Sequence, residues 1–112
     1  MTPMLHASNG TLRVALTSED GAWFAQGLEV DYFAAGETLE EAEQNFQEGL
    51  AITVKRHLKK FGTLDRMKPT PPVVVREYYP LDQFRSLAVR KLTKVQSVAP
   101  QFPFDSVEFL AP

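Results

Sequence analysis

The sequence predicts an α+β fold, in which a small antiparallel sheet is covered on one face by one long helix. Three short segments of β-type composition, separated by turn residues, precede one long segment of helical periodicity. Strands joined by short turns form antiparallel sheets, and an amphipathic helix that follows them buries its apolar stripe on one face. At 112 residues, the chain is long enough for one core and too short for two. We expect residues 1–79 to form this domain and residues 80–112 to form a C-terminal extension.

The three predicted strands follow a polar lead-in over residues 1–10 and occupy residues 12–17, 22–28 and 32–35. In the first of them, Leu12, Val14 and Leu16 alternate with their neighbours, which is the period of a half-buried strand. The dipeptide Asp20-Gly21 comes next and supplies the positive φ angles that a tight hairpin needs. These signals predict a three-stranded meander.

The long helix is predicted between Gly36 and Gly62. Thr38 is followed three residues later by Glu41, which is the capping box that starts a helix, and Gly62 stands where a left-handed C-cap glycine belongs. Acidic residues crowd the first turns and basic residues the last turns, as the helix macrodipole favours. The apolar stripe comprises Leu39, Ala42, Phe46, Leu50, Val54, Leu58 and Phe61.

Beyond this helix, the sequence predicts a linker and a fourth strand. Pro69, Pro71 and Pro72 indicate an extended linker. The β-branched and aromatic run over residues 73–79 favours a strand, which ends before Pro80.

The C-terminal extension is predicted to contain a second helix and an apolar tail. Apolar residues recur at helical spacing over residues 81–95, whereas a strand through Leu87 and Val89 is the alternative. The tail over residues 99–112 contains three prolines but also several large apolar side chains. Such groups each forfeit about 1.5–3 kcal/mol when they stay in water, so we expect the tail to dock on its own domain or on a second chain. The residues predicted for such an interface are Ile52, which points away from the helix stripe, Phe102, Phe104, Phe109 and Leu110.

Charge is distributed unevenly along the chain, although the net charge is only −2. Nine acidic residues and no basic one lie between Glu19 and Glu48, whereas eleven basic and three acidic residues lie between Lys55 and Lys94. The acidic half suits a basic partner. The basic half leaves nucleic-acid binding as an alternative, through Lys55, Arg56, Lys59, Lys60, Arg66 and Lys68 and then Arg85, Arg90, Lys91 and Lys94.

No catalytic or metal-binding motif is recognisable. The chain has no cysteine, and His6 lies far along the chain from His57, which falls on the helix stripe. We therefore expect no enzymatic activity, no cofactor and no metal site. The sequence has no long apolar run, and no N-terminal stretch joins a basic region to an apolar one as in a secretory signal. We therefore expect a cytoplasmic protein without a membrane span.

Three segments, residues 23–29, 35–42 and 45–50, resemble the HicB family of antitoxins and their stand-alone relatives. The motif residues are Gly36, Thr38, Glu41, Ala42 and Asn45. The resemblance implies a β-β-β-α-β domain, described as a reduced ribonuclease-H-like fold, that binds and blocks a HicA-type toxin. Such a toxin is a small basic ribonuclease that cleaves mRNA.

The resemblance also implies self-association, and we favour a symmetric dimer in which the tail or a sheet edge crosses to the partner. Many family members carry a C-terminal DNA-binding module, but the segment beyond Tyr79 does not match one. The alternatives to the antitoxin are a stand-alone oligomeric protein with another protein partner and a nucleic-acid binder.

Overall fold

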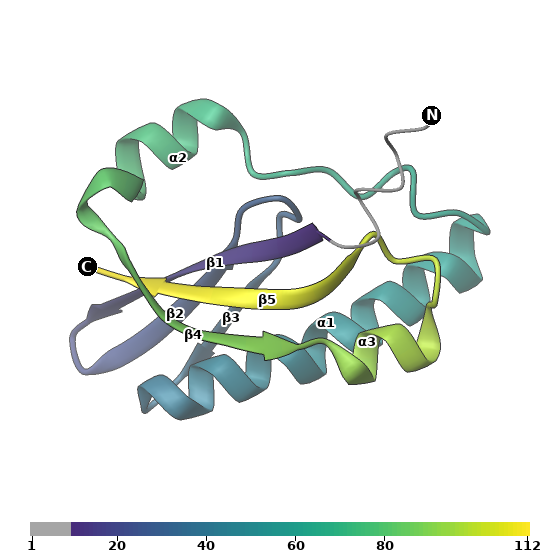
Figure 1. Ribbon diagram of the computed structural model, residues 1–112, viewed down its shortest axis with the longest axis horizontal. Helices are drawn as coiled ribbons and strands as arrows, with labels where there is room; N and C mark the ends of the chain where they lie inside the picture. Colours follow the sequence, from purple (N-terminus) through teal and green to yellow (C-terminus); the bar gives the residue numbers. More distant parts are fainter. Residues whose placement is uncertain (1–9) are drawn as a thin grey trace.

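The computed structural model describes residues 10–112, so most of the predicted lead-in, with His6, lies outside the described residues. The strands are β1 (Gly10–Glu19), β2 (Ala22–Gly27), β3 (Phe33–Gly36), β4 (Arg85–Lys91) and β5 (Phe104–Ala111), as Figure 1 shows. The helices are α1 (Leu39–Phe61), α2 (Pro72–Tyr78) and α3 (Thr93–Val98), with a 3-10 turn at Leu81–Gln83. The predicted α+β class is confirmed.

The five strands form one mixed sheet in the order β3-β2-β1-β5-β4. Neighbouring strands are antiparallel except for β1 and β5, which run parallel in the centre of the sheet. The prediction of a purely antiparallel sheet is therefore wrong. It assumed strands joined by short turns, whereas β5 comes from the far end of the sequence and lies directly beside β1.

The hairpin between β1 and β2 forms as predicted. Asp20 and Gly21 have φ angles of 53° and 81°, so both residues of the turn adopt the left-handed conformation that matches the twist of the strands. Glu19 is paired with Ala22 directly across this turn. Leu12, Val14 and Leu16 of β1 are fully buried as predicted, but Ala15 between them is fully buried too, so the expected alternation of buried and exposed residues holds only in part.

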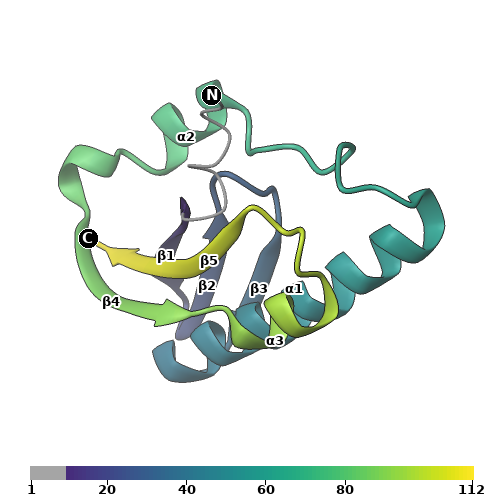
Figure 2. The ribbon, with the colours of Figure 1, turned by 45° about the vertical axis from the view of Figure 1, so that its right-hand side comes forward.

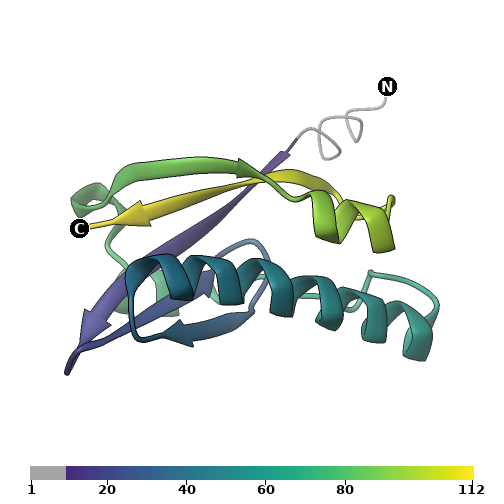
Figure 3. The ribbon, with the colours of Figure 1, turned by 90° about the horizontal axis from the view of Figure 1, so that it is seen from below.

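The helix α1 begins and ends where its capping signals stand. The Thr38 hydroxyl accepts a hydrogen bond from the Glu41 N–H at 3.1 Å. The Glu41 carboxylate accepts one from the N–H of Glu37 at 2.9 Å, one residue earlier than an ideal capping box requires. Gly62 closes the helix with a φ of 72°, and its N–H donates to the Leu58 carbonyl at 2.8 Å. In Figure 3, α1 crosses one face of the sheet, where its buried residues meet those of the strands.

The Thr38 cap gives a first prediction. Thr38→Ala removes the acceptor for the Glu41 N–H, so we expect the free energy of unfolding to fall by about 1 kcal/mol. Urea denaturation measures this difference, with Thr93→Ala as the control because Thr93 is exposed and its hydroxyl makes no hydrogen bond within residues 10–112. Equal losses in the two variants would contradict the assignment of Thr38 as the cap.

The C-terminal half differs from the prediction at three places. The predicted strand over residues 73–79 is the helix α2, which starts with Pro72 at a first-turn position and buries none of its residues. The predicted helix over residues 81–95 is wrong as well, and the alternative strand through Leu87 and Val89 is confirmed as β4, with the short α3 after it. The tail contains the strand β5. Residues 80–112 thus supply two of the five strands of the sheet.

Candidate functional site

The residues that carry the family resemblance meet at the junction of β3 and α1. The cap between Thr38 and Glu41 starts the helix, and Asn45 Nδ2 donates to a backbone carbonyl of β3 at 2.8 Å. A Cβ on Gly36 would lie 2.5 Å from the backbone nitrogen of Ala42, which is itself fully buried. Only glycine permits so close an approach of strand and helix. The motif therefore holds β3 against the first turns of α1, which is a structural role.

The residues predicted for an interface do not share one surface. Phe102 and Phe109 are 2% and 0% exposed and belong to the core of this chain, so the expectation that they meet a second chain is wrong. Phe104 and Leu110 are half-buried in β5, which pairs with β1 and β4. Only Ile52 remains substantially exposed, at 53%, on the solvent side of α1.

Carboxylates from two separate segments gather at one end of the molecule. Trp23 of β2 is paired with Gly36 of β3, so the β1–β2 turn lies beside the segment that leads into α1. Figures 1 and 3 show this turn and the start of α1 at the same end. The exposed carboxylates there, which we call the acidic end, are Glu19, Asp20, Glu37, Glu40 and Glu41. None of them forms an ion pair within residues 10–112, so their negative charge faces solvent uncompensated.

A cleft of about 510 Å³ opens beside the acidic end and is lined largely by aromatic side chains. Because Ala25 of β2 points into the core, its neighbour Phe24 points to the opposite face of the sheet, away from α1. The Phe24 ring stacks on Phe33 of β3, with centroids 5.6 Å apart. Phe33 is nevertheless 51% exposed. The lining residues, which define the aromatic cleft, are Thr17, Ser18, Glu19, Phe24, Phe33, Tyr78 and Tyr79.

The second wall of the aromatic cleft comes from the end of α2 and from Tyr79, and a hydrogen-bond network holds the linker that leads to α2. The Thr70 hydroxyl donates to the Gly27 carbonyl at 2.6 Å, and its backbone N–H donates to the Leu28 carbonyl at 2.8 Å. Gln26 Nε2 donates to the Thr70 hydroxyl at 3.1 Å and to the Asp31 carboxylate at 2.9 Å. Thr70 is itself buried. This network fixes the linker from α1 against the β2–β3 loop, and Figure 2 shows the linker continuing from there to α2.

The two tyrosines of the cleft differ in their surroundings. Tyr78 is 67% exposed, the highest value among the large apolar and aromatic side chains of the described residues. Tyr79 is half-buried, and its burial, followed by the negative charge of Asp31, raises the pKa of its phenol above the usual range. The phenol of Tyr79 therefore stays neutral at physiological pH and keeps its proton as a hydrogen-bond donor.

The chemistry of the aromatic cleft suits a cation. A guanidinium or ammonium group binds favourably over the face of an aromatic ring, and the interaction strengthens when water is excluded. Glu19 adds a carboxylate at the rim, in no ion pair with any residue of the described range. A single basic side chain entering the cleft would meet both partners at once.

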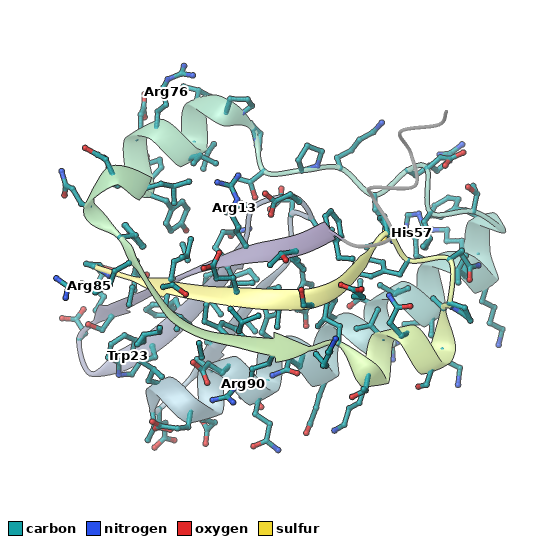
Figure 4. The ribbon with its side chains drawn as sticks, in the orientation of Figure 1. Arg13, Trp23, His57, Arg76, Arg85 and Arg90 are labelled. Carbon is teal, nitrogen blue, oxygen red and sulfur yellow. The ribbon has the colours of Figure 1, made fainter. Side chains whose placement is uncertain are left out.

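Two ion pairs connect α1 with β4 and α3. Arg90 Nη2 of β4 lies 3.8 Å from Glu43 Oε1, and Figure 4 shows Arg90 directed toward α1. Lys94 Nζ of α3 lies 3.2 Å from Glu48 Oε2. Burial raises the pKa of the Glu43 carboxyl, which Arg90 partly offsets, and hydrogen bonds from Gln44 and Lys94 lower the pKa of Glu48.

Four of the basic residues that were predicted as a nucleic-acid surface make contacts within the chain. Arg90 and Lys94 are engaged with carboxylates of α1. Lys60 Nζ and Arg66 Cζ lie 5.3 and 4.7 Å from the centroid of the Phe61 ring, at the far end of α1. His57 also packs against Phe61, with ring centroids 4.7 Å apart, which agrees with its predicted place on the helix stripe.

The aromatic cleft was not predicted from the sequence. Phe24 and Phe33 were read only as strand-forming residues, and Tyr78-Tyr79 as part of a fourth strand. One signal in the sequence indicated where Phe24 lies. Neighbouring residues of a strand point to opposite faces, so Phe24 and Gln26 lie on the face away from α1 once Ala25 is assigned to the core. The position of α2 over that face carried no local signal, since it depends on the Thr70 network.

Within residues 10–112, no three histidine, aspartate or glutamate side chains are grouped so as to hold a metal ion. In the same range, no helix combines the length and the apolar character that crossing a membrane requires. A scan against protein-family models, a search of curated proteins and a search of solved structures each gave no match to this chain.

Proposed function

We propose that this chain is a non-enzymatic, cytoplasmic protein-binding module that captures a small basic protein through the acidic end and the aromatic cleft. The partner that we propose is a mRNA-cleaving toxin of the HicA type, in keeping with the resemblance of the sequence to HicB antitoxins. The observation that carries the proposal is the position of Glu19, which belongs both to the acidic end and to the rim of the aromatic cleft.

The two surfaces have complementary tasks in such a complex. Uncompensated carboxylates at the acidic end attract a basic protein over a distance and raise its association rate. Exposed aromatic rings provide the anchor, since aromatic and arginine side chains dominate the binding energy of protein interfaces. An arginine of the partner that stacks in the cleft and pairs with Glu19 would combine both contributions.

The same surface disfavours a nucleic acid as the direct ligand. Five uncompensated carboxylates would repel a phosphate backbone, whereas they attract the basic surface with which a ribonuclease holds RNA. A stand-alone oligomeric protein is the second candidate, and the exposed Ile52 on the solvent side of α1 favours it. In that case α1, and not the tail, would meet a second copy.

Binding measurements with cleft variants test the proposal. The partner for this measurement is a short basic protein, encoded next to the gene for this chain if our proposal is right, in a form without nuclease activity. We expect Phe33→Ala and Tyr78→Ala each to weaken its binding about tenfold or more, because each removes an exposed ring from the cleft. Isothermal titration calorimetry gives the dissociation constants, and Glu19→Gln should in addition reduce their dependence on salt concentration.

The control variant is Val98→Ala, an exposed apolar side chain of α3 outside the lining of the cleft. Unchanged binding by the cleft variants, or equal losses in Val98→Ala, would contradict the proposed site. A neighbouring gene that encodes no short basic protein would contradict the toxin as the partner.

A further inference from the structure

The strand β4 is an edge of the sheet and is exposed along nearly its whole length. Its neighbour on one side is β5, and no strand within residues 10–112 pairs with its other side. Of its seven residues only Ala88 is half-buried. The backbone N–H and C=O groups on the free side of an edge strand offer a ready template for one more strand.

Two apolar side chains of β4 are unusually exposed for a soluble edge. Leu87 is 46% exposed and lies at an irregularity between Ser86 and Ala88, where the register with β5 shifts. Val89 is 61% exposed and is paired with Glu108 of β5. A strand added to β4 would cover both side chains in addition to pairing the free backbone groups.

The edge is bordered by a groove that gives the side chains of an added strand room. This groove has a volume of about 300 Å³ and lies between α1 on one side and the end of β4 with α3 on the other. Gln44, Gln47 and Thr93 line it with uncharged polar groups. The pairs Glu43–Arg90 and Glu48–Lys94 and the carboxylate of Glu40 line the rest. An edge strand beside a helix, with a groove between them, is the arrangement in which peptides bind by strand addition.

Charge selects the occupant. The sequence of β4 contains Arg85, Arg90 and Lys91 and no carboxylate, and neither Arg85 nor Lys91 forms an ion pair within the described residues. Two copies of β4 placed edge to edge would bring four unpaired cations together, Arg85 and Lys91 from each copy, which opposes self-pairing. A strand that carries carboxylates would neutralise the same cations.

We infer that β4 is a docking site for an extended acidic segment of a second protein, which adds to the sheet as a sixth strand. This site is separate from the aromatic cleft, with which it shares no lining residue. Its unpaired cations, Arg85 and Lys91, have the opposite charge to the acidic end, of which Glu40 borders the groove. A chain with both sites can hold a basic partner and an acidic segment at the same time.

Hydrogen exchange with synthetic peptides tests the inference. The probe is a peptide with capped ends, as long as β4, in which glutamate and valine alternate. If it pairs with β4 one residue out of register, its glutamates move to the other face of the sheet, so the peptide can present its carboxylates on either face. We expect this peptide to slow the amide exchange of β4 and to bind at low salt, while a peptide of alternating lysine and valine does neither.

Charge reversal separates recognition by β4 from unspecific attraction. We expect the double variant Arg85→Glu, Lys91→Glu to bind the glutamate peptide up to about tenfold more weakly than the parent does. It should bind the lysine peptide instead. The matched control is Lys55→Glu, Lys59→Glu, which makes the same change in charge on exposed positions of α1. The variant Arg85→Glu, Lys91→Glu should keep the free energy of unfolding of the parent, since both side chains are exposed. The control should lose up to about 1 kcal/mol, because Lys59→Glu places a carboxylate in the last turn of α1.

Several results would overturn the inference. They are equal losses of binding in the two double variants, slowed exchange elsewhere than in β4, and no slowing at all. Protection of β4 that rises with protein concentration in the absence of peptide would mean that a second copy occupies the edge. The cleft variants Phe33→Ala and Tyr78→Ala should leave peptide binding unchanged, so failure of this inference and failure of the proposed function remain distinguishable.

Discussion

Phe46→Ala is expected to lower the free energy of unfolding by about 3–5 kcal/mol. Phe46 of α1 is fully buried at the centre of the core. Its ring makes edge-to-face contacts with Tyr32, at a centroid distance of 5.3 Å, and with Phe109 of β5, at 6.3 Å. Truncation to alanine removes both contacts and leaves a cavity between helix and sheet. Urea denaturation followed by circular dichroism measures the loss.

Ile52→Ala is the matched control, because Ile52 is an apolar residue of the same helix but is 53% exposed. Its truncation creates no cavity, so we expect a change within about 0.5 kcal/mol. A double-mutant cycle with Phe109→Ala should give losses that do not add, because the two rings touch. A larger loss in Ile52→Ala than in Phe46→Ala would contradict the orientation of α1.

Deletion of residues 104–112 is expected to abolish folding. This deletion removes β5, which contributes the fully buried Val107 and Phe109 and pairs with β1 on one side and β4 on the other. Without it, β4 has no neighbour in the sheet, β1 becomes an unpaired edge, and Phe46 of α1 loses its contact with Phe109. We expect circular dichroism to show no cooperative unfolding transition for the shortened chain.

Deletion of Pro112 alone serves as the control, because this residue is exposed and lies outside β5. It should leave the free energy of unfolding within about 0.5 kcal/mol of that of the full chain. A shortened chain without residues 104–112 that still unfolded cooperatively would show that β1, β2, β3 and α1 form a stable core by themselves.

The first half of the fold could be predicted because its signals are local. The turn at Asp20-Gly21 and the caps at Thr38 and Gly62 each need only a few neighbouring residues. The apolar stripe of α1 needs one helix and no knowledge of its partner. These elements therefore follow from short stretches of sequence, whatever the rest of the chain does.

The second half of the fold was harder to predict, because its elements depend on contacts between distant segments of the chain. The run over residues 73–79 has the composition of a strand but finds no strand to pair with, and Pro72 starts a helix there instead. The prolines of the tail argue against a regular helix, and they hide a strand signal. Val107, Phe109 and Ala111 alternate with their neighbours as the residues of a half-buried strand do. That β5 lies beside β1 has no local signal at all.

The candidate site could be predicted only in part. The acidic end follows from the charge asymmetry of the sequence, which places most carboxylates before Glu48. The aromatic cleft does not follow, because Phe24, Phe33 and Tyr78 come together only when α2 crosses the face of the sheet opposite α1. The five predicted interface residues were chosen for apolar character, and burial in the sheet accounts for Phe102 and Phe109.

The parallel pairing of β1 with β5 also governs when this chain can fold during its synthesis. The hydroxyl groups of Thr11 and Ser106 lie 3.0 Å apart although 95 residues separate them in the sequence. A ribosome must therefore release the chain beyond residue 106 before the centre of the sheet can close. Until then, the edge of β1 and the part of α1 that contacts β5 stay open to chaperones and proteases, and closing so long a loop slows the final step. We expect the nascent protein to complete its core only after translation has passed β5.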